Sequence, residues 1–316
     1  MILLIALVAA ATMLALVAPA VLLRIDFGAA PVVGIVAWVG AMSATIGLGM
    51  LALAALAWPG DPPGNSRVGA LARSLAEVEP MIITWTAELI MPAAICGLIV
   101  PAGLVARVAV VHRRHASARR RRHAELIGVL GRADPGGAGV VWLEHPVPMA
   151  YSVAGHGGYV VVTDGLARCL TRAQWRAVLA HEHAHLRGRH HHILGVCQVL
   201  AGAFPRIPLF AAAPSALTTL VELAADRAAA TRTDPQSLGS ALRAVAVHGA
   251  PMSMSAVDPT HDSLAMRLAC LGAAPKFRSA SRRRAAWALA GTMLLVPVTA
   301  VLAVGLGSAA AFLAMI

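Results

Sequence analysis

The chain has 316 residues and a formal net charge of +11, and 58% of its residues are hydrophobic while only 13% are charged. Its mean hydropathy of +0.72 is far from that of a water-soluble domain, so a membrane protein is the first expectation. The four cysteines form no CxxC pair, which argues against a disulfide framework or a thiolate metal site.

Three apolar segments precede residue 112. Residues 1–23 are long enough to cross a bilayer, and no basic segment precedes them, which favours a retained helix over a cleaved signal peptide. Residues 27–58 are rich in Gly and Ala, as suits close helix packing in lipid. A third segment lies between Glu88 and Arg107. We therefore expect three transmembrane helices with short loops within residues 1–111.

Two cationic clusters set the expected topology. They are "HRRHASARRRRH", residues 112–123, and "KFRSASRRR", residues 276–284, and the apolar run 285–316 after them is expected to be a fourth transmembrane helix. The positive-inside rule places both clusters in the cytosol, with a cytosolic domain at residues 112–284 and both termini outside the bacterial cell membrane. Membrane lipids are expected partners. Topology and anionic lipids account for the arginines, so no direct nucleic-acid binding is expected.

Mixed elements are expected between the two clusters. Residues 124–133 have a helical pattern, whereas "VVWLEHPV" at 140–147 and "GYVVVTDG" at 158–165 have strand composition, and the second is expected to offer a sheet edge to a peptide. Thr171 and Gln174 form a capping-box signature at the start of a helix. The predicted fold is thus an α-helical membrane protein with an inserted, mainly helical α+β domain. Within it, residues 193–213 are expected to form a helical hairpin packed against the spans.

The stretch "LAHEHAHLRG", residues 179–188, contains an HExxH motif. His181 and His185 are four residues apart and therefore share one face of a helix, where they can bind one metal ion. Glu182 lies between them, placed to act as general base toward a metal-bound water. His183 is expected to be a neighbour rather than a ligand. One of the histidines at 190–192 could face the cleft, but the simpler interpretation is a polar helix surface.

A third ligand is expected from "SALTTLVELAADRAAA", residues 215–230. Glu222 and Asp226 again share a helix face, so we predict Glu222 as the ligand and Asp226 as the partner of a liganding histidine. The alternative is a solvated acidic pair facing Arg227 or Arg232.

The HExxH motif and the later "ELAADRAA" resemble the integral-membrane zinc metallopeptidases of the gluzincin type, which pair HExxH with ExxxD. Three spans before the catalytic segment and one after it resemble the BlaR/MecR family, the antirepressor peptidases of beta-lactam resistance. The resemblance implies one Zn²⁺ per chain and the zincin-type fold. It also implies these roles: zinc ligands His181, His185 and Glu222, base Glu182, and supporting residue Asp226.

A further element, "THDSLAMR", is similar to a His-Pro…Arg element of related membrane peptidases. It makes His261 and Arg267 candidates for stabilising the oxyanion, although Asp262 stands where proline is usual.

The resemblance implies a zinc metalloendopeptidase that cleaves a BlaI/MecI-like DNA-binding repressor, and itself, in antibiotic-resistance signalling. The given sequence ends after the last apolar run, so the extracellular penicillin-binding sensor domain of that family is expected to be lacking. Two alternatives stay open. One is a membrane-protein quality-control peptidase, and the other is a non-catalytic signalling protein stapled by zinc. The sequence also leaves open whether the chain forms an oligomer.

Overall fold

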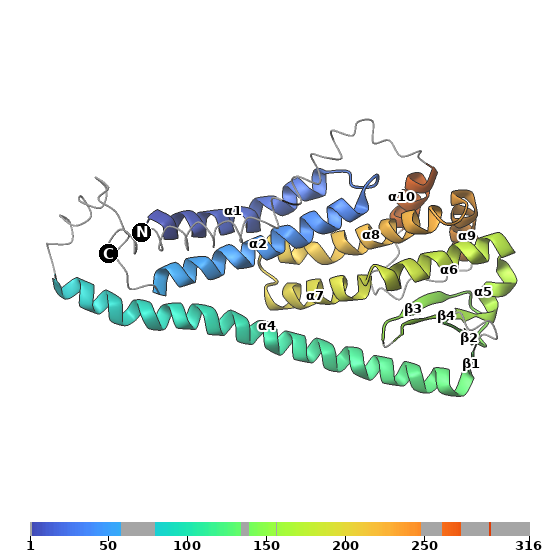
Figure 1. Ribbon diagram of the computed structural model, residues 1–316, viewed down its shortest axis with the longest axis horizontal. Coiled ribbons are helices and arrows are strands. Elements are labelled where there is room, and N and C mark those ends of the chain that lie inside the picture. Colours follow the sequence, from blue (N-terminus) through green and yellow to red (C-terminus); the bar gives the residue numbers. More distant parts are fainter. Residues whose placement is uncertain are drawn as a thin grey trace, which may run out of the picture.

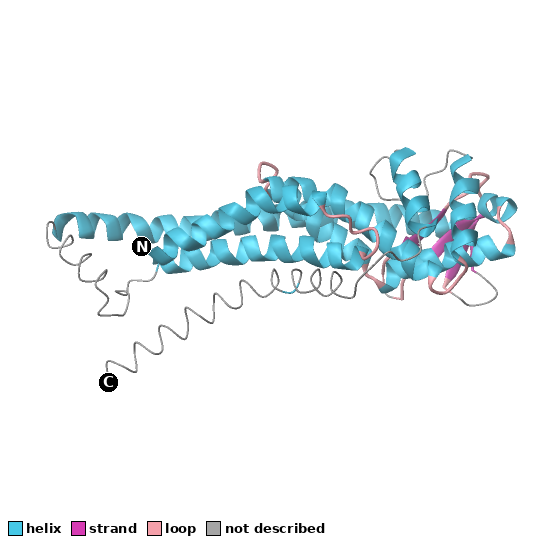
Figure 2. Cartoon of the chain, turned by 90° about the horizontal axis from the view of Figure 1, so that it is seen from above, coloured by secondary structure: helices cyan, strands magenta, loops and turns pink. Residues whose placement is uncertain are grey.

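The computed structural model describes residues 2–57, 80–133, 139–155, 157–247, 261–272 and 291. This part of the chain is mostly helical and elongated, with long helices side by side along one axis (Figure 1). The strands lie together at one end of the molecule (Figure 2). Four of the described helices are long and apolar enough to cross a membrane.

The first two helices confirm two of the predicted helical segments. Helix α1, Ile2–Arg24, and helix α2, Pro31–Ala57, lie against each other in opposite directions (Figure 1). Both are apolar around their whole circumference, and large side chains such as Ile5 and Met13 are more than half exposed, as suits helices in contact with lipid.

Helix α4, Pro80–Leu130, is one helix of 51 residues. Its candidate membrane-spanning part is Pro92–Arg119. The sequence predicted a span that ends at Arg107 and a separate helix at 124–133, but the residues between contain no Gly or Pro, so nothing there interrupts the helix. The predicted boundary between membrane and cytosolic parts, at residue 111, therefore falls inside a continuous helix.

The sheet has four strands in the order β1-β2-β4-β3: β1 Gly131–Ala133, β2 Val140–Leu143, β3 Ala150–Val153 and β4 Tyr159–Thr163. Strands β2 and β4 are parallel, and the other pairs are antiparallel. The expectation that residues 158–165 offer a free edge is wrong, because β4 lies between β2 and β3. Its three consecutive valines at 160–162 are fully buried, as is typical of a central strand. The edge strands are β1 and β3.

Helices α5, Asp164–Cys169, α6, Arg172–Arg187, and α9, Pro235–Val247, pack near the sheet. The predicted capping box of α6 is confirmed, since Thr171 Oγ1 accepts from the Gln174 backbone and Gln174 Oε1 accepts from the Thr171 backbone. Gln174 also donates to Ser240 Oγ of α9 at 3.0 Å. The N-terminus of α6 is thereby fixed to a second helix.

Helices α7, His190–Ala203, and α8, Pro208–Ala230, form the predicted hairpin. Helix α8 packs against α1 and α2, and α7 packs against α4. Trp38 of α2 is 1% exposed in a core shared with α8, and a Cβ on Gly34 would lie 2.9 Å from Leu220. The absence of a side chain at Gly34 therefore lets α2 approach α8 closely.

Helix α8 is also the fourth candidate membrane span. The span predicted at 285–316 lies outside the described residues, except for residue 291. Helix α10, His261–Gly272, completes the described chain and packs against α8 and α9.

Candidate metal centre

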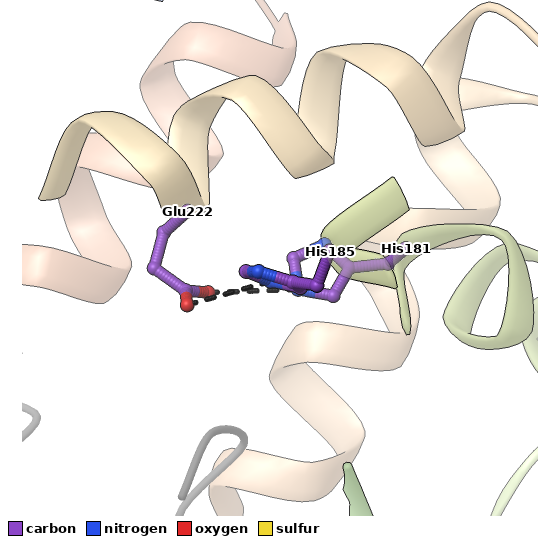
Figure 3. Close-up of side chains that lie close together, drawn as sticks. All are labelled: His181, His185 and Glu222. Atoms are coloured by element: carbon purple, nitrogen blue, oxygen red, sulfur yellow. Dashed lines mark hydrogen bonds and ion pairs between the residues drawn. The ribbon is translucent and has the colours of Figure 1, made fainter. Parts of the chain in front are cut away.

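Helices α6 and α8 bring together the three predicted metal ligands (Figure 3). His181 Nε2 lies 3.1 Å from His185 Nε2 and 3.5 Å from Glu222 Oε2. His185 Nε2 lies 3.5 Å from Glu222 Oε1. Residues some forty positions apart in the sequence thus direct their donor atoms at one point between the two helices.

These distances fit a small divalent cation. Zinc binds histidine nitrogen at about 2.0–2.1 Å in tetrahedral geometry, so two of its ligand atoms are expected about 3.3 Å apart. The observed separations of 3.1, 3.5 and 3.5 Å bracket that value. Two imidazoles and a carboxylate also form a donor set that zinc prefers. A tetrahedral ion held by these three residues has one position left for water.

Asp226 contacts the ring nitrogen of His181 that does not face the other two ligands. Asp226 Oδ1 lies 2.9 Å from His181 Nδ1, the ring nitrogen on the far side from Glu222. Arg267 of α10 binds both oxygens of Asp226, with nitrogen–oxygen distances of 2.7 and 2.6 Å, and its Nη1 lies 3.2 Å from Glu222 Oε2. Asp226 is only 2% exposed, so the alternative of a solvated acidic pair is wrong.

The net charge of the buried ionised groups would be balanced by a cation of charge +2. Glu182, Glu222 and Asp226 contribute three carboxylates, and Arg267 contributes one permanent positive charge. All four side chains are largely buried, and buried charge is costly unless it is compensated. A divalent ion would bring the sum to zero.

The two histidine ligands differ in their electrostatics. Burial lowers the pKa of His181, but the Asp226 and Glu222 carboxylates beside its ring outweigh burial and raise the pKa to about 10. Burial, followed by the nearby His181, lowers the pKa of His185 to about 3. In the protein alone, a proton on His181 therefore supplies part of the positive charge that a metal ion would bring, while His185 stays neutral.

Glu182 lies on the same helix and is 4% exposed. Burial raises the pKa of this carboxyl to about 7, against the opposing effect of His181. Ser152 of strand β3 lies beside the Glu182 carboxyl and also lowers its pKa, against the effect of burial. A carboxyl that gains and loses its proton near neutral pH is suited to proton transfer.

The other predicted residues are placed as follows. His183 Nδ1 lies 2.7 Å from the Leu179 carbonyl of its own helix, which agrees with its expected role as a neighbour. The guanidinium of Arg267, a predicted candidate for the oxyanion, binds Asp226 and Glu222. Helix α10 begins at His261, but the side chain of this residue lies outside the described part of the chain.

Sequence reasoning did not single out His190. This residue is 7% exposed, and its Nδ1 lies 3.0 Å from His185 Nδ1. Burial lowers its pKa to about 4, so it is neutral at pH 7. The only signal in the sequence was its position five residues after His185, at the start of a run of three histidines.

Comparison with known proteins agrees with this geometry. No curated protein and no solved structure matches the chain. A protein-family model matches residues 114–220, a stretch that includes the whole HExxH motif and ends two residues before Glu222. That model describes Peptidase family M48, and residues 114–220 are therefore similar to this family.

Proposed function

We propose that the chain is a zinc-dependent endopeptidase whose ligands are His181, His185 and Glu222. The observation that carries this proposal is the convergence of their donor atoms, within 4.8 Å of one another, beside the buried Glu182. Zinc, when bound, polarises the substrate carbonyl and lowers the pKa of a coordinated water toward neutrality. The peptidase family match supports hydrolysis of peptide bonds.

Glu182 is the general base in this proposal. It takes the proton of the attacking water and passes it to the leaving amine, so its carboxyl must change protonation state near the working pH. In the metal-free chain, burial raises the pKa of this carboxyl to about 7. Asp226 keeps His181 oriented, and Arg267 in turn keeps Asp226 in place.

The substrate is an extended peptide that adds to strand β3. Within the described residues β3 pairs in the sheet only with β4, so it is an edge strand of the kind to which a peptide adds. Ser152 of this strand lies close enough to the proposed base, Glu182, to lower the pKa of its carboxyl. A peptide paired along β3 therefore passes Glu182. Binding through the peptide backbone at an edge strand does not require a chain end, so it suits cleavage within a chain.

The centre belongs at the membrane surface. A cavity of about 470 Å³ lies between the turn that joins α1 to α2, at Asp26 and Phe27, and the α8 residues Thr219 and Leu223. The turn between two candidate spans and the α8 residues next to Glu222 in the sequence thus line one cavity. The cationic segment 112–123 supports a cytosolic orientation for this end and outer positions for both termini.

Membrane proximity and the resemblance to BlaR/MecR peptidases together favour a protein substrate at the cytosolic face, with a BlaI/MecI-like repressor as the first candidate. A quality-control peptidase that clears misfolded membrane proteins has the same chemistry and the same location. The two functions differ in their substrates.

The chemistry is tested with Glu182→Gln in purified, lipid-reconstituted protein. We expect this variant to bind one zinc ion per chain and to lose cleavage of an unfolded protein substrate. Glu144→Gln is the matched control, because it removes the same charge from an exposed position. Cleavage by the Glu182→Gln variant at the wild-type rate would refute the mechanism.

The substrate is identified by comparing new protein N-termini in cells that carry wild type or Glu182→Gln. Fragments of a helix-turn-helix repressor in wild-type cells alone would support regulated signalling. Fragments of many membrane proteins would support quality control. If no fragments differ and zinc has four protein ligands, the chain is a zinc-stapled signalling protein.

A further inference from the structure

His185 is contacted on both of its ring nitrogens. Its Nε2 faces His181 and Glu222, and its Nδ1 lies 3.0 Å from Nδ1 of His190. The rings of His185 and His190 are perpendicular, with centroids 4.9 Å apart. His190 is 7% exposed and comes from the first turn of α7, a different helix from its partner.

The chemistry of imidazole assigns a direction to this contact. A neutral imidazole has one N–H, and the ring nitrogen that binds a metal must have a free lone pair. If His185 offers Nε2 to the metal, its hydrogen is on Nδ1. The atom of His190 within hydrogen-bond distance is Nδ1, which must then be the acceptor, with its own hydrogen on Nε2.

The corner between α6 and α7 is shaped to allow the contact. Arg189 has φ +49°, and it is the one non-glycine residue with positive φ among those the structure describes. This left-handed residue turns the chain so that His190 returns toward His185. A Cβ on Gly188 would lie 2.3 Å from His190 Nε2, so the glycine leaves space for the ring.

We propose that His190 is a positioning residue that accepts the Nδ1–H of His185 and thereby holds the Nε2 lone pair toward the metal. His190 does for His185 what Asp226 does for His181. The inference rests on the proposed metal site, but its first readout is zinc affinity rather than peptidase activity.

The decisive pair of variants is His190→Leu and His190→Asn. Leucine fills similar space but accepts no hydrogen bond, whereas the Asn Oδ1 occupies about the position of His Nδ1 and accepts one. Loss of such a partner typically costs about 10- to 100-fold in metal affinity. We expect that loss for Leu and recovery to within about threefold of wild type for Asn. His192→Leu, on the exposed part of α7, is the matched control and should bind zinc normally.

Zinc affinity is measured in the full-length protein by competition with a chelator at pH 7.5, and kcat and KM are measured separately. Gly188→Ala provides a second route, since it displaces the His190 ring without changing any donor or acceptor, and it should weaken zinc binding as Leu does. Wild-type zinc affinity in His190→Leu, or an equal loss in the Leu and Asn variants, would overturn the proposal. If the chain binds zinc but cleaves nothing, the affinity pattern still tests His190, and only the peptidase function fails.

Discussion

Glu182→Gln should make the metal-free protein more stable. In the folded chain, burial raises the pKa of Glu182 from its ordinary 4.5 to about 7. Each pKa unit corresponds to about 1.4 kcal/mol, so ionised Glu182 costs about 3 kcal/mol of folding free energy. Glutamine has nearly the same shape as glutamate, but it has no charge to bury. We therefore expect a gain of up to about 3 kcal/mol.

The gain should depend on pH. Below pH 4.5 Glu182 is protonated in both the folded and the unfolded chain, so the substitution gains nothing. Between pH 4.5 and 7 the unfolded chain loses its proton first, and the stability of wild type falls as the pH rises. Above pH 7 the carboxyl is charged in both states and the full difference is present.

The assay is thermal unfolding in detergent with a chelator present, at pH 5 and pH 8 and at one fixed scan rate. At about 2–4 °C per kcal/mol, the variant should unfold about 6–12 °C above wild type at pH 8 and much closer to it at pH 5. The control Glu144→Gln, at an exposed position, should not change the unfolding temperature at either pH. Our account of the buried charge is refuted if Glu182→Gln is no more stable than wild type at pH 8, or if its advantage is the same at both pH values.

Other substitutions test the rest of the site. Glu222→Gln removes the charged ligand, so zinc affinity measured by chelator competition should fall by roughly 100-fold or more. Asp226→Asn leaves the ligands in place but weakens the partner of His181, and we expect a fall of about 10- to 100-fold in the same assay. Arg267→Ala removes the guanidinium that binds two buried carboxylates and should lower stability by about 3–5 kcal/mol without metal, with a smaller loss when zinc is saturating. Trp38→Ala opens a cavity between α2 and α8 and should cost about 3–5 kcal/mol in chemical denaturation.

Sequence reasoning succeeded where the structure is determined locally. The position of α6 follows from the Thr171 cap, and the shared face of His181 and His185 follows from helical periodicity. Helices α1 and α2 follow from uninterrupted apolar composition. In each case the signal lies within a few neighbouring residues.

Features that depend on distant packing could not be predicted. The run of valines in β4 is compatible with an edge or a central position, and only the pairing of β3 decides between them. Helix α8 is apolar enough to be a span and also carries Glu222, so composition alone did not separate these two roles. The contact of His190 with His185 depends on the positive φ of Arg189, which no feature of the sequence predicts.

Helix α8 has a mechanical consequence for the centre. Its first half packs against α1 and α2 through residues such as Phe210 and Leu217, while its second half contains Glu222. Both imidazoles belong to α6, whose start is pinned to α9. Glu222 therefore belongs to a helix that packs among the apolar helices. The two histidine ligands belong to a helix that packs against the sheet. Any displacement of α8 relative to α6 would change the distances between Glu222 and the two histidines, and so the size of the metal site.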